Sequence, residues 1–307
     1  MSSPERSRVA TERVWSALPA EARSVLLDGL SPTDLQTLLL DVVWTRAQRV
    51  DASRLMSRWR EDRFVRPAAV DPRAHSRLVA QLWAALPREF EGVELSPVAP
   101  LGSCAGVAAA DQNRIISTVR GSEVVSDLTN VLALEAAQRR RESGSATVHL
   151  AAHHRVIRAQ QFPAGYSAHF SLFALVSSAR GRAGRATELG LLRAHGQAWT
   201  ALVTPILGAE GFQITYSTYG DVALAQQILN ELGPELSPLV EDPDREHGRG
   251  YYASASVKIR TGRGADQQEI GDGGFTDWTA RLTADAKERC LVSCVATERL
   301  LAATATQ

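Results

Sequence analysis

Residues 146–177, which read ATVHLAAHHRVIRAQQFPAGYSAHFSLFALVS, decide the fold class of this chain. Two segments of this stretch, Ala146–Leu150 and Phe170–Ser177, are short and rich in β-branched or aromatic side chains, which is typical of strands. Polar or glycine-bearing residues separate them, as they separate three further segments of the same kind. Those segments are Gln112–Thr118, Phe212–Ser217 and Tyr251–Ile259.

Helical patterns lie between the predicted strands. The clearest are Leu128–Arg141, Glu188–Leu207 and Val222–Leu232. Strands and helices do not alternate with the regular cadence that a parallel sheet requires. The sequence therefore predicts an α+β fold, in which helices flank a mostly antiparallel sheet.

The N-terminal part reads as a helical extension. Ser31 and Pro32 suit the start of a helix, and apolar residues recur at helical spacing over 35–43. This helical pattern runs on toward Arg66, and a proline-bearing break follows at Pro67–Pro72. A second helix is expected between Asp71 and Phe90. The predicted domains are therefore a helical region at 1–70 and a larger domain at 71–307.

Basic residues gather in the second half of the helical region. They form either a basic face for RNA or an acidic protein partner, or simply a solvated helix surface. The arginines are Arg46, Arg49, Arg54, Arg58, Arg60, Arg63 and Arg66, and the acids among them are Asp51, Glu61 and Asp62.

The composition excludes several classes of protein. Of the 307 residues, 44% are hydrophobic and 22% are charged, which is typical of a globular protein. No run of about 18 apolar residues is present to cross a membrane, and the N-terminus lacks the apolar stretch of a secretory signal. The 34 basic residues balance the 34 acidic ones, unlike the chains that bind nucleic acid through overall charge. Three cysteines make no even disulfide framework, so we expect a cytoplasmic protein.

Common motifs of catalysis are absent. The chain has no glycine-rich phosphate loop that ends in Lys-Ser or Lys-Thr, and no His-Glu-x-x-His zinc helix. Cys290 and Cys294 lack a second pair of zinc ligands, and no histidine is identifiably paired with Cys104 as a nucleophile requires. His153 and His154 point to opposite faces if they lie on a strand. We therefore predict no protein-bound metal site.

Four separated segments have a recognisable order. They are Val125–Asn130, His154–Gln160 with Ala168–Phe170, Gly250–Tyr252 running to Gly273–Gly274, and Thr297–Leu300. Taken together they resemble the catalytic domain of class II aminoacyl-tRNA synthetases, and within that class the histidyl-tRNA synthetase-like group. The resemblance covers roughly residues 72–307. Residues 72–100 resemble motif 1, which implies a homodimer.

The resemblance implies a role for each matched residue. Arg158 would bridge the α-phosphate of ATP and the incoming carboxylate, Arg299 would hold the γ-phosphate with Mg²⁺, and Asp127 with Thr129 would receive a substrate amino group. The implied catalytic residues are Arg158, Arg299 and Arg249. The implied ATP-binding residues are Arg158, Gln160, His169, Phe170, Glu298 and Arg299, and the implied substrate-binding residues are Asp127, Thr129, Tyr251, Tyr252, Gly273 and Gly274.

Several positions depart from the pattern of the group. Gln160 replaces a glutamate, Leu172 replaces a glutamine that contacts the substrate, and Phe275-Thr276 replaces the Arg-Tyr pair of the histidine pocket. Val292 and Ala296 stand at positions where the group has glycines. No anticodon-binding domain is recognised after the catalytic domain. Histidine is therefore not the expected substrate, and ordinary tRNA charging is not the expected reaction.

Two functions follow from the resemblance. The first, which we favour, is ATP-dependent adenylation of an amino acid or related small carboxylate, with transfer to a non-standard acceptor. That acceptor would be an RNA or a protein bound through the N-terminal helices. The alternative is a catalytically silent paralogue that regulates a partner enzyme, as the histidine-biosynthesis regulatory subunit of this group does.

Overall fold

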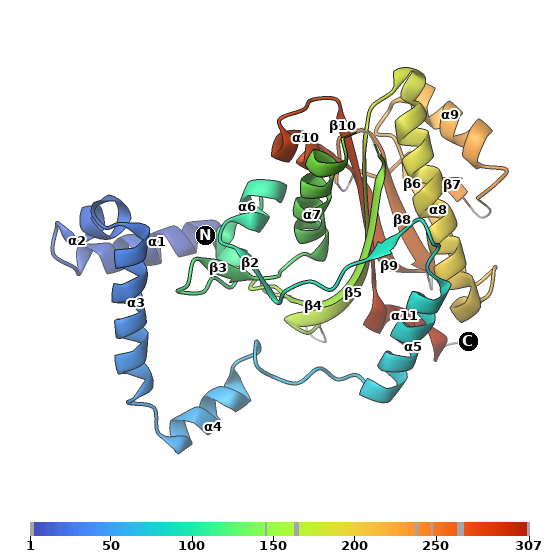
Figure 1. Cartoon of the computed structure of the whole chain (residues 1–307). Helices are drawn as coiled ribbons and strands as arrows, with labels where there is room; N and C mark the ends of the chain where they lie inside the picture. Colours follow the sequence, from blue (N-terminus) through green and yellow to red (C-terminus); the bar gives the residue numbers. More distant parts are fainter. Residues whose placement is uncertain are drawn as a thin grey trace. The chain divides into compact units, whose positions relative to one another are not determined.

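The structure is a computed structural model, and it describes residues 3–144, 146–162, 166–236, 239–246, 248–262 and 267–305. The chain divides into two compact units (Figure 1). One unit extends to Asp62 and includes Thr118–Gly121, and the other comprises the remaining residues. No described helix combines the length and the apolar character of a membrane-spanning segment.

The first unit is helical. Its helices are α1 (Ser3–Ser16), α2 (Ala22–Ser24), the π-helical η1 (Val25–Gly29), α3 (Pro32–Ala47) and α4 (Ala52–Glu61). The predicted start of α3 is confirmed, because the Ser31 hydroxyl oxygen accepts a hydrogen bond from Asp34 N at 3.1 Å. The predicted continuation toward Arg66 is wrong. The Asp51 carboxylate accepts from Arg54 N at 2.7 Å and thereby caps a separate helix, α4.

The second unit is built on an eight-stranded sheet, which confirms the predicted mostly antiparallel architecture. Neighbouring strands pair in antiparallel order from β4 to β6, and two short strands pair in parallel at the edges. In spatial order the strands are β1 (Glu91–Gly92), β4 (Val148–Ile157), β5 (His169–Arg180), β10 (Glu288–Ala296), β9 (Gln268–Thr276), β8 (Ser256–Thr261), β6 (Phe212–Ser217) and β7 (Leu239–Glu241). A separate pair joins β2 (Val98–Pro100) to β3 (Ser122–Val124).

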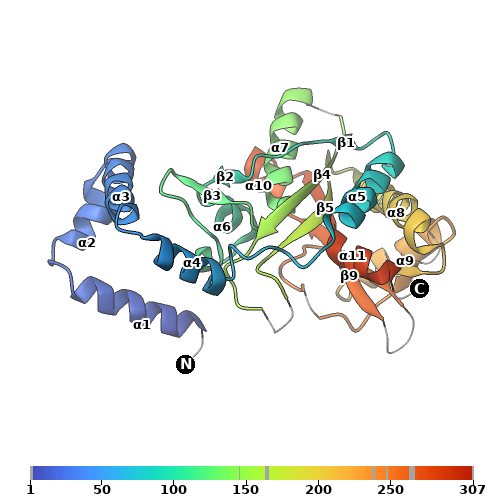
Figure 2. The same ribbon diagram turned by 90° about the horizontal axis from the view of Figure 1, so that it is seen from below.

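Helices cover both faces of the sheet (Figures 1 and 2). One apolar core forms against α5 (Pro72–Ala85), α8 (Ala186–Leu207), α9 (Val222–Leu232) and α11 (Thr297–Thr304). A second core forms on the other face, against α6 (Ser103–Ala108), α7 (Leu128–Ser143) and α10 (Trp278–Thr283). Short 3-10 helices, η2 (Gln112–Arg114) and η3 (Ala183–Arg185), connect larger elements.

The expected elements agree with the structure to different degrees. The predicted strand Phe212–Ser217 and the predicted helix Val222–Leu232 are confirmed to the residue. The predicted strand at 112–118 is wrong, because the Asp111 carboxylate accepts from Asn113 N at 3.0 Å and starts the 3-10 turn η2 instead. The strand expected from Tyr251 begins only at Ser256.

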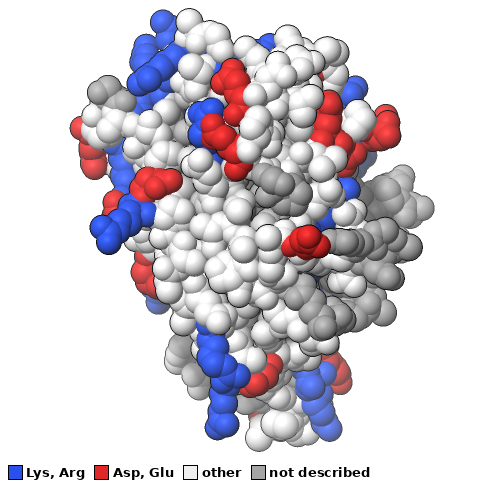
Figure 3. All heavy atoms as spheres, turned by 90° about the vertical axis from the view of Figure 1, so that its right-hand side faces the viewer, with Lys and Arg blue, Asp and Glu red and all other residues white. Residues whose placement is uncertain are grey.

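Surface charge is mixed on the face that carries α8 and α9. Figure 3 shows Lys and Arg side chains scattered among Asp and Glu side chains around a broad uncharged area. A basic patch of the kind that tracks a nucleic-acid backbone is not visible on the described part of this face.

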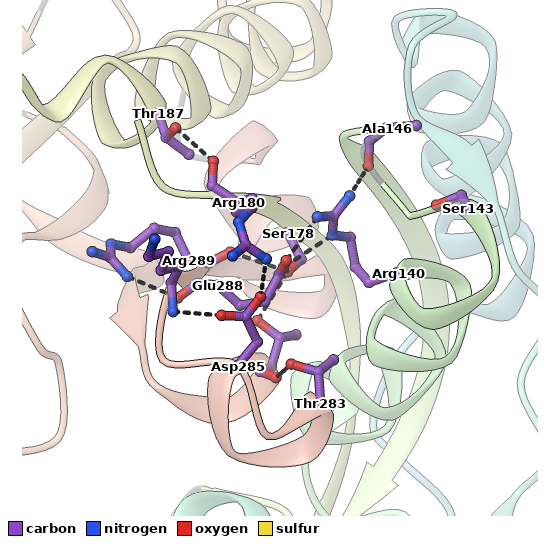
Figure 4. Close-up of polar contacts among 12 residues, drawn as sticks. Arg140, Ser143, Ala146, Ser178, Arg180, Thr187, Thr283, Asp285, Glu288 and Arg289 are labelled. Carbon is purple, nitrogen blue, oxygen red and sulfur yellow. Dashed lines mark hydrogen bonds and ion pairs between the residues drawn. The ribbon is translucent and has the colours of Figure 1, made fainter. Parts of the chain in front are cut away.

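A buried ion pair joins α7 to β10 at one end of the sheet (Figure 4). The Arg140 guanidinium donates to both Glu288 carboxylate oxygens, at 2.9 Å and 2.7 Å, and both side chains are less than 5% exposed. The Ser178 hydroxyl on β5 donates to Glu288 Oε2 at 3.0 Å. Charge-assisted hydrogen bonds therefore fix the three elements together at a site that is shielded from solvent.

We expect Glu288→Leu to lower the free energy of unfolding by about 3 kcal/mol, because it leaves the buried Arg140 charge without a carboxylate partner. The double variant Arg140→Leu with Glu288→Leu should recover most of that loss. Urea denaturation of the single and double variants measures both values. A double variant as unstable as the single one would contradict the account.

Two adjacent histidines of strand β4, His153 and His154, lie on opposite faces, as predicted. Ala151 belongs to the core beneath α8 and Ala152 to the core beneath α7, so strand alternation places His153 with the first and His154 with the second. The His153 ring centroid lies 5.6 Å from that of His75 on α5. Burial, reinforced by the nearby His75, lowers the pKa of His153 from 6.5 to about 4.

Because the folded chain resists protonation of His153, the unfolded chain binds more protons between pH 6.5 and 4. Stability should therefore fall as the pH is lowered through this window. In His153→Leu that fall should be smaller by about 2 kcal/mol, a figure that allows for the partial exposure of the ring. Urea unfolding at a series of pH values tests this, and an equal pH dependence in wild type and variant would contradict it.

Candidate functional site

A cavity of about 850 Å³ lies on the α7 side of the sheet. Its floor consists of alternate residues of two paired strands, Leu172 on β5 and Val292, Cys294 and Ala296 on β10. The register pairs Ala296 with Leu172, so these side chains lie on one face. A concave site of this volume suits a small-molecule ligand.

The start of α7 contributes a capped acid to the wall. Asp127 Oδ1 accepts hydrogen bonds from Thr129 N at 3.0 Å and from the Thr129 hydroxyl at 2.7 Å. The second oxygen, Oδ2, lies 3.4 Å from a terminal nitrogen of Arg158. Asp127 is therefore the N-cap of α7 and at the same time a lining residue of the cavity.

Arg158 follows β4 and lies across the cavity wall. Its Nε donates to Ser126 O at 2.9 Å, and its guanidinium lies 5.2 Å from the centroid of the Phe170 ring. The contact with Asp127 is long for an ion pair, and the Arg158 side chain is 31% exposed. The guanidinium therefore keeps a face available to an anion in the cavity.

Arg299 enters the same cavity from α11. It donates to the backbone oxygen of Glu269 at 3.1 Å, and its guanidinium lies 5.4 Å from the centroid of the Tyr166 ring. The neighbouring Glu298 accepts from Arg155 at 2.6 Å. The fold thus brings Arg158 and Arg299 to one cavity, although 140 residues separate them in sequence.

A tyrosine pair lines another side of the cavity, and a buried arginine outside the lining binds an acid of the same wall. The Tyr252 hydroxyl donates to Asp272 Oδ2 at 3.2 Å, and Arg245, only 3% exposed, donates to Asp272 Oδ1 at 2.7 Å. The Tyr251 ring packs edge-on against Tyr252 and Trp278. Burial raises the pKa of both tyrosines, so their hydroxyls remain protonated and can donate hydrogen bonds.

Gly273 and Gly274 do not line the cavity. A Cβ at Gly274 would lie 2.5 Å from the Tyr252 ring, and a Cβ at Gly273 would lie 2.4 Å from Val292 O. Packing therefore explains both glycines, because a side chain would clash with the Tyr252 ring at Gly274 and with β10 at Gly273. Their role in substrate binding stays a prediction.

The lining carries four arginines and four acids, but these are not paired one to one. Each acid of the wall has a cationic partner: Asp127 faces Arg158, Asp272 binds Arg245, Glu298 binds Arg155, and Glu269 binds Lys258 at 2.9 Å. Three further arginines of the wall have no carboxylate partner among the described residues. These are Arg114, Arg249 and Arg299. The cavity therefore favours an anionic ligand.

The cysteines are protonated at neutral pH. Burial raises the pKa of Cys294, on the cavity floor, to about 12, and it raises the pKa of Cys290 to about 11. Burial also raises the pKa of Cys104, whose sulfur accepts from Asn130 Nδ2 at 3.1 Å. A nucleophilic cysteine needs a lowered pKa, so the environment of these thiols does not favour covalent catalysis.

Most of the predicted site residues meet at this cavity. The lining contains Arg158, Arg299, Arg249, Phe170, Glu298, Asp127, Thr129, Tyr251 and Tyr252. Gln160 and His169 do not line it; instead they bond to a preceding segment of the chain, through the Gln160 backbone oxygen and the His169 ring. Pro163, Ala164 and Gly165, in the loop between β4 and β5, lie outside the described residues.

Sequence reasoning missed Arg114, Phe162 and Arg245. Arg114 belongs to the 3-10 turn that was expected to be a strand, and Arg245 is recognised only through its contact with the distant Asp272. The interpretation of Phe275 needs correction as well. It lies in the core on the opposite face of the sheet, 2% exposed, so it does not shape this cavity.

Comparisons with known proteins agree with this architecture. No protein-family model matches the chain, and no curated protein sequence matches it. Solved structures do match. An ATP phosphoribosyltransferase regulatory subunit/histidyl-tRNA synthetase from Bacillus halodurans superposes with a TM-score of 0.60 at 12% identity, over 80% of this chain and 83% of that one.

Two further structures are similar. Apo histidyl-tRNA synthetase from S. aureus gives a TM-score of 0.54 at 15% identity, over 75% of this chain and 64% of that one. A histidine–tRNA ligase subunit from Alicyclobacillus acidocaldarius gives 0.53 at 14% identity, over 79% and 97%. Such similarity at low identity establishes the fold. The chain therefore has the class II aminoacyl-tRNA synthetase fold.

Proposed function

We propose that this chain binds ATP in the cavity and adenylates an amino acid or a related small carboxylate. The observation that carries the proposal is that three arginines of the lining have no carboxylate partner among the described residues, whereas each acid of the lining is paired, in a cavity large enough for a nucleotide. The triphosphate of ATP is polyanionic, and arginine binds phosphate through its forked guanidinium.

The reaction joins two anions, which sets the electrostatic requirement. A carboxylate oxygen of the substrate attacks the α-phosphorus, the bond to the bridging oxygen breaks, and pyrophosphate leaves with that oxygen and its electron pair. Arg158 would lower the repulsion between the carboxylate and the α-phosphate, and Arg299 would hold the γ-phosphate of the departing group. Phe170 would pack against the adenine ring.

The Asp127–Arg158 contact suggests how substrate and nucleotide depend on each other. At 3.4 Å it is a loose ion pair whose partners are both partly exposed. A substrate ammonium that approaches Asp127 Oδ2 would compete with Arg158 for that oxygen. The guanidinium would then be freed to turn toward the phosphate, so that the charge needed for the reaction becomes available when the substrate is present.

The residues present are compatible with Mg²⁺ that arrives with the triphosphate. Mg²⁺ commonly uses one or two carboxylates together with substrate phosphates, and Glu298 and Glu269 line the cavity beside Arg299. The described residues contain no group of three or more metal-ligating side chains. When bound, Mg²⁺ would neutralise phosphate charge.

The substrate is proposed to be a carboxylate other than histidine. The floor beside Asp127 is formed by Leu172, Val292 and Cys294, whose side chains do not provide the strong hydrogen-bonding groups that an imidazole needs. We further propose a cytoplasmic location and transfer of the activated group to an RNA or protein acceptor that binds through the N-terminal helices.

The alternative is a silent paralogue that regulates a partner enzyme. One observation favours it: Val292 and Ala296, at positions where the group has glycines, both line the cavity floor. Their side chains reduce the space beside the proposed adenine position. In this alternative the cavity binds a ligand without chemistry, and a regulatory subunit is among the proteins of similar fold.

ATP–pyrophosphate exchange across the twenty standard amino acids separates the two functions. We expect exchange that one amino acid other than histidine stimulates. Arg158→Ala and Arg299→Ala should each reduce it by about 100-fold, because each removes a charge that binds the transferring or departing phosphates. Arg182→Ala, which removes an exposed arginine outside the cavity lining, is the matched control and should leave exchange unchanged.

Circular dichroism of each variant must show a folded protein before the exchange rates are compared. Blank exchange by a folded wild-type chain that still binds ATP would support the silent paralogue. Failure of the wild-type chain to bind ATP would overturn the nucleotide site itself.

We also propose that the chain forms a homodimer through residues 72–100. Light scattering at micromolar concentration should report twice the mass of 33.2 kDa. A stable monomer at that concentration would contradict the proposal.

A further inference from the structure

A short segment between α4 and α5 is bonded to the end of the β4–β5 pair. This strap comprises residues 63–66 and belongs to the same unit as the sheet. The Arg63 guanidinium donates to Gln160 O at 2.7 Å and also to Ala159 O. The Arg66 backbone oxygen lies 2.6 Å from His169 Nε2. The strap therefore contacts both strand ends, one on the β4 side and one on the β5 side.

The bonded residues adjoin the cavity residues. Ala159 follows Arg158, and His169 precedes Phe170, and both Arg158 and Phe170 line the cavity. Arg158 N also donates to Ala168 O at 2.9 Å, and Ala159 N donates to Arg114 O at 2.8 Å. A displacement of Ala159 would therefore move the backbone that carries Arg158.

A second set of contacts leads from the strap to α11. The neutral His169 ring that donates from Nε2 to Arg66 O leaves Nδ1 free to accept from Arg155 at 3.0 Å. Arg155 in turn donates to Glu298 at 2.6 Å, and Glu298 precedes Arg299. Hydrogen bonds thus connect the strap to Ala159, the neighbour of Arg158, and to Glu298, the neighbour of Arg299.

Arg63 differs from the other arginines of its region. Arg54, Arg58 and Arg60 on α4 are exposed, whereas Arg63 is half-buried and donates to two successive backbone oxygens. Charge-assisted bonds from one rigid fork fix the position of both oxygens at once, which a lysine ammonium does less well. The contact is therefore a specific one within a sequence that otherwise reads as a solvated basic surface.

We propose that Arg63 is a positioning residue for the nucleotide site: it holds the strand end that carries Arg158 and does not touch the nucleotide itself. The identity of the ligand rests on the proposed function. The positioning role itself rests on the strap contacts and does not depend on the proposed function. Since α4 ends at Glu61, the strap is also where the helical unit joins the unit that carries the site.

The test compares Arg63→Ala and Arg63→Lys with the control Arg182→Ala, which removes an exposed arginine outside the cavity lining. All variants are made in the full chain. Calorimetric titration with Mg·ATP measures affinity, and hydrogen exchange measures protection of the Arg158 and Ala159 amides. We expect Arg63→Ala to bind Mg·ATP about tenfold more weakly and to exchange both amides faster. Arg63→Lys should be intermediate, and Arg182→Ala should match the wild type.

Thermal midpoints within a few degrees of wild type must accompany these effects, so that general unfolding does not explain them. Unchanged amide exchange in Arg63→Ala would overturn the proposal, as would faster exchange with wild-type affinity for Mg·ATP. If the wild-type chain binds no Mg·ATP, the proposed function fails. The amide exchange of Arg63→Ala alone then decides whether the strap positions this strand end.

Discussion

The antiparallel pairing of β5 with β10 is the constraint on which the rest of the site depends. The register runs without a shift from Glu288 opposite Arg180 to Ala296 opposite Leu172. Strand alternation then sends one set of side chains to the cavity and the other to the core beneath α8. A slip of one residue would exchange these faces, so that Cys294 and Ala296 would leave the cavity floor.

The two ends of this pairing are used differently. At one end Glu288 is buried and fully paired with Arg140, and it joins α7 to the sheet. At the other end the cationic groups are only partly satisfied: Arg158 has one long contact with a carboxylate, and Arg299 contacts a backbone oxygen. At the first end the charged groups bind each other and hold the fold together. At the second end the guanidinium groups remain available to a ligand, as a binding site for anions requires.

The sequence predicted correctly those helices and strands whose local apolar pattern matches the surface that they bury in the fold. The helix Val222–Leu232 and the strand Phe212–Ser217 have clear periodicity and were located to the residue. The strand β9 contains Gly271, Gly273 and Gly274, which weaken a strand pattern, yet a Cβ at any of them would meet a neighbouring atom at less than 3 Å. Composition could not identify that strand, because tertiary packing selects its glycines.

The same distinction applies to the site. Arg158 and Arg299 were identified because they belong to short ordered motifs, whereas Arg114 and Arg245 have no local signal and acquire their positions through contacts made by folding. The resemblance associated Phe275 with the substrate pocket because a motif gives the order of residues and not the parity of the strand, whereas the structure places Phe275 in the core on the other face. Sequence patterns thus located the arginines that stand in ordered motifs but not those that folding alone brings to the site.

The central claim is that one nucleotide is held between Arg158 and Arg299, and a crystal structure of the chain with ATP tests it most directly. The account predicts a triphosphate in this cavity, with the α-phosphate within hydrogen-bonding distance of Arg158 and the γ-phosphate within hydrogen-bonding distance of Arg299. ATP bound elsewhere on the chain, or bound in the cavity with its phosphates away from both guanidinium groups, would contradict it.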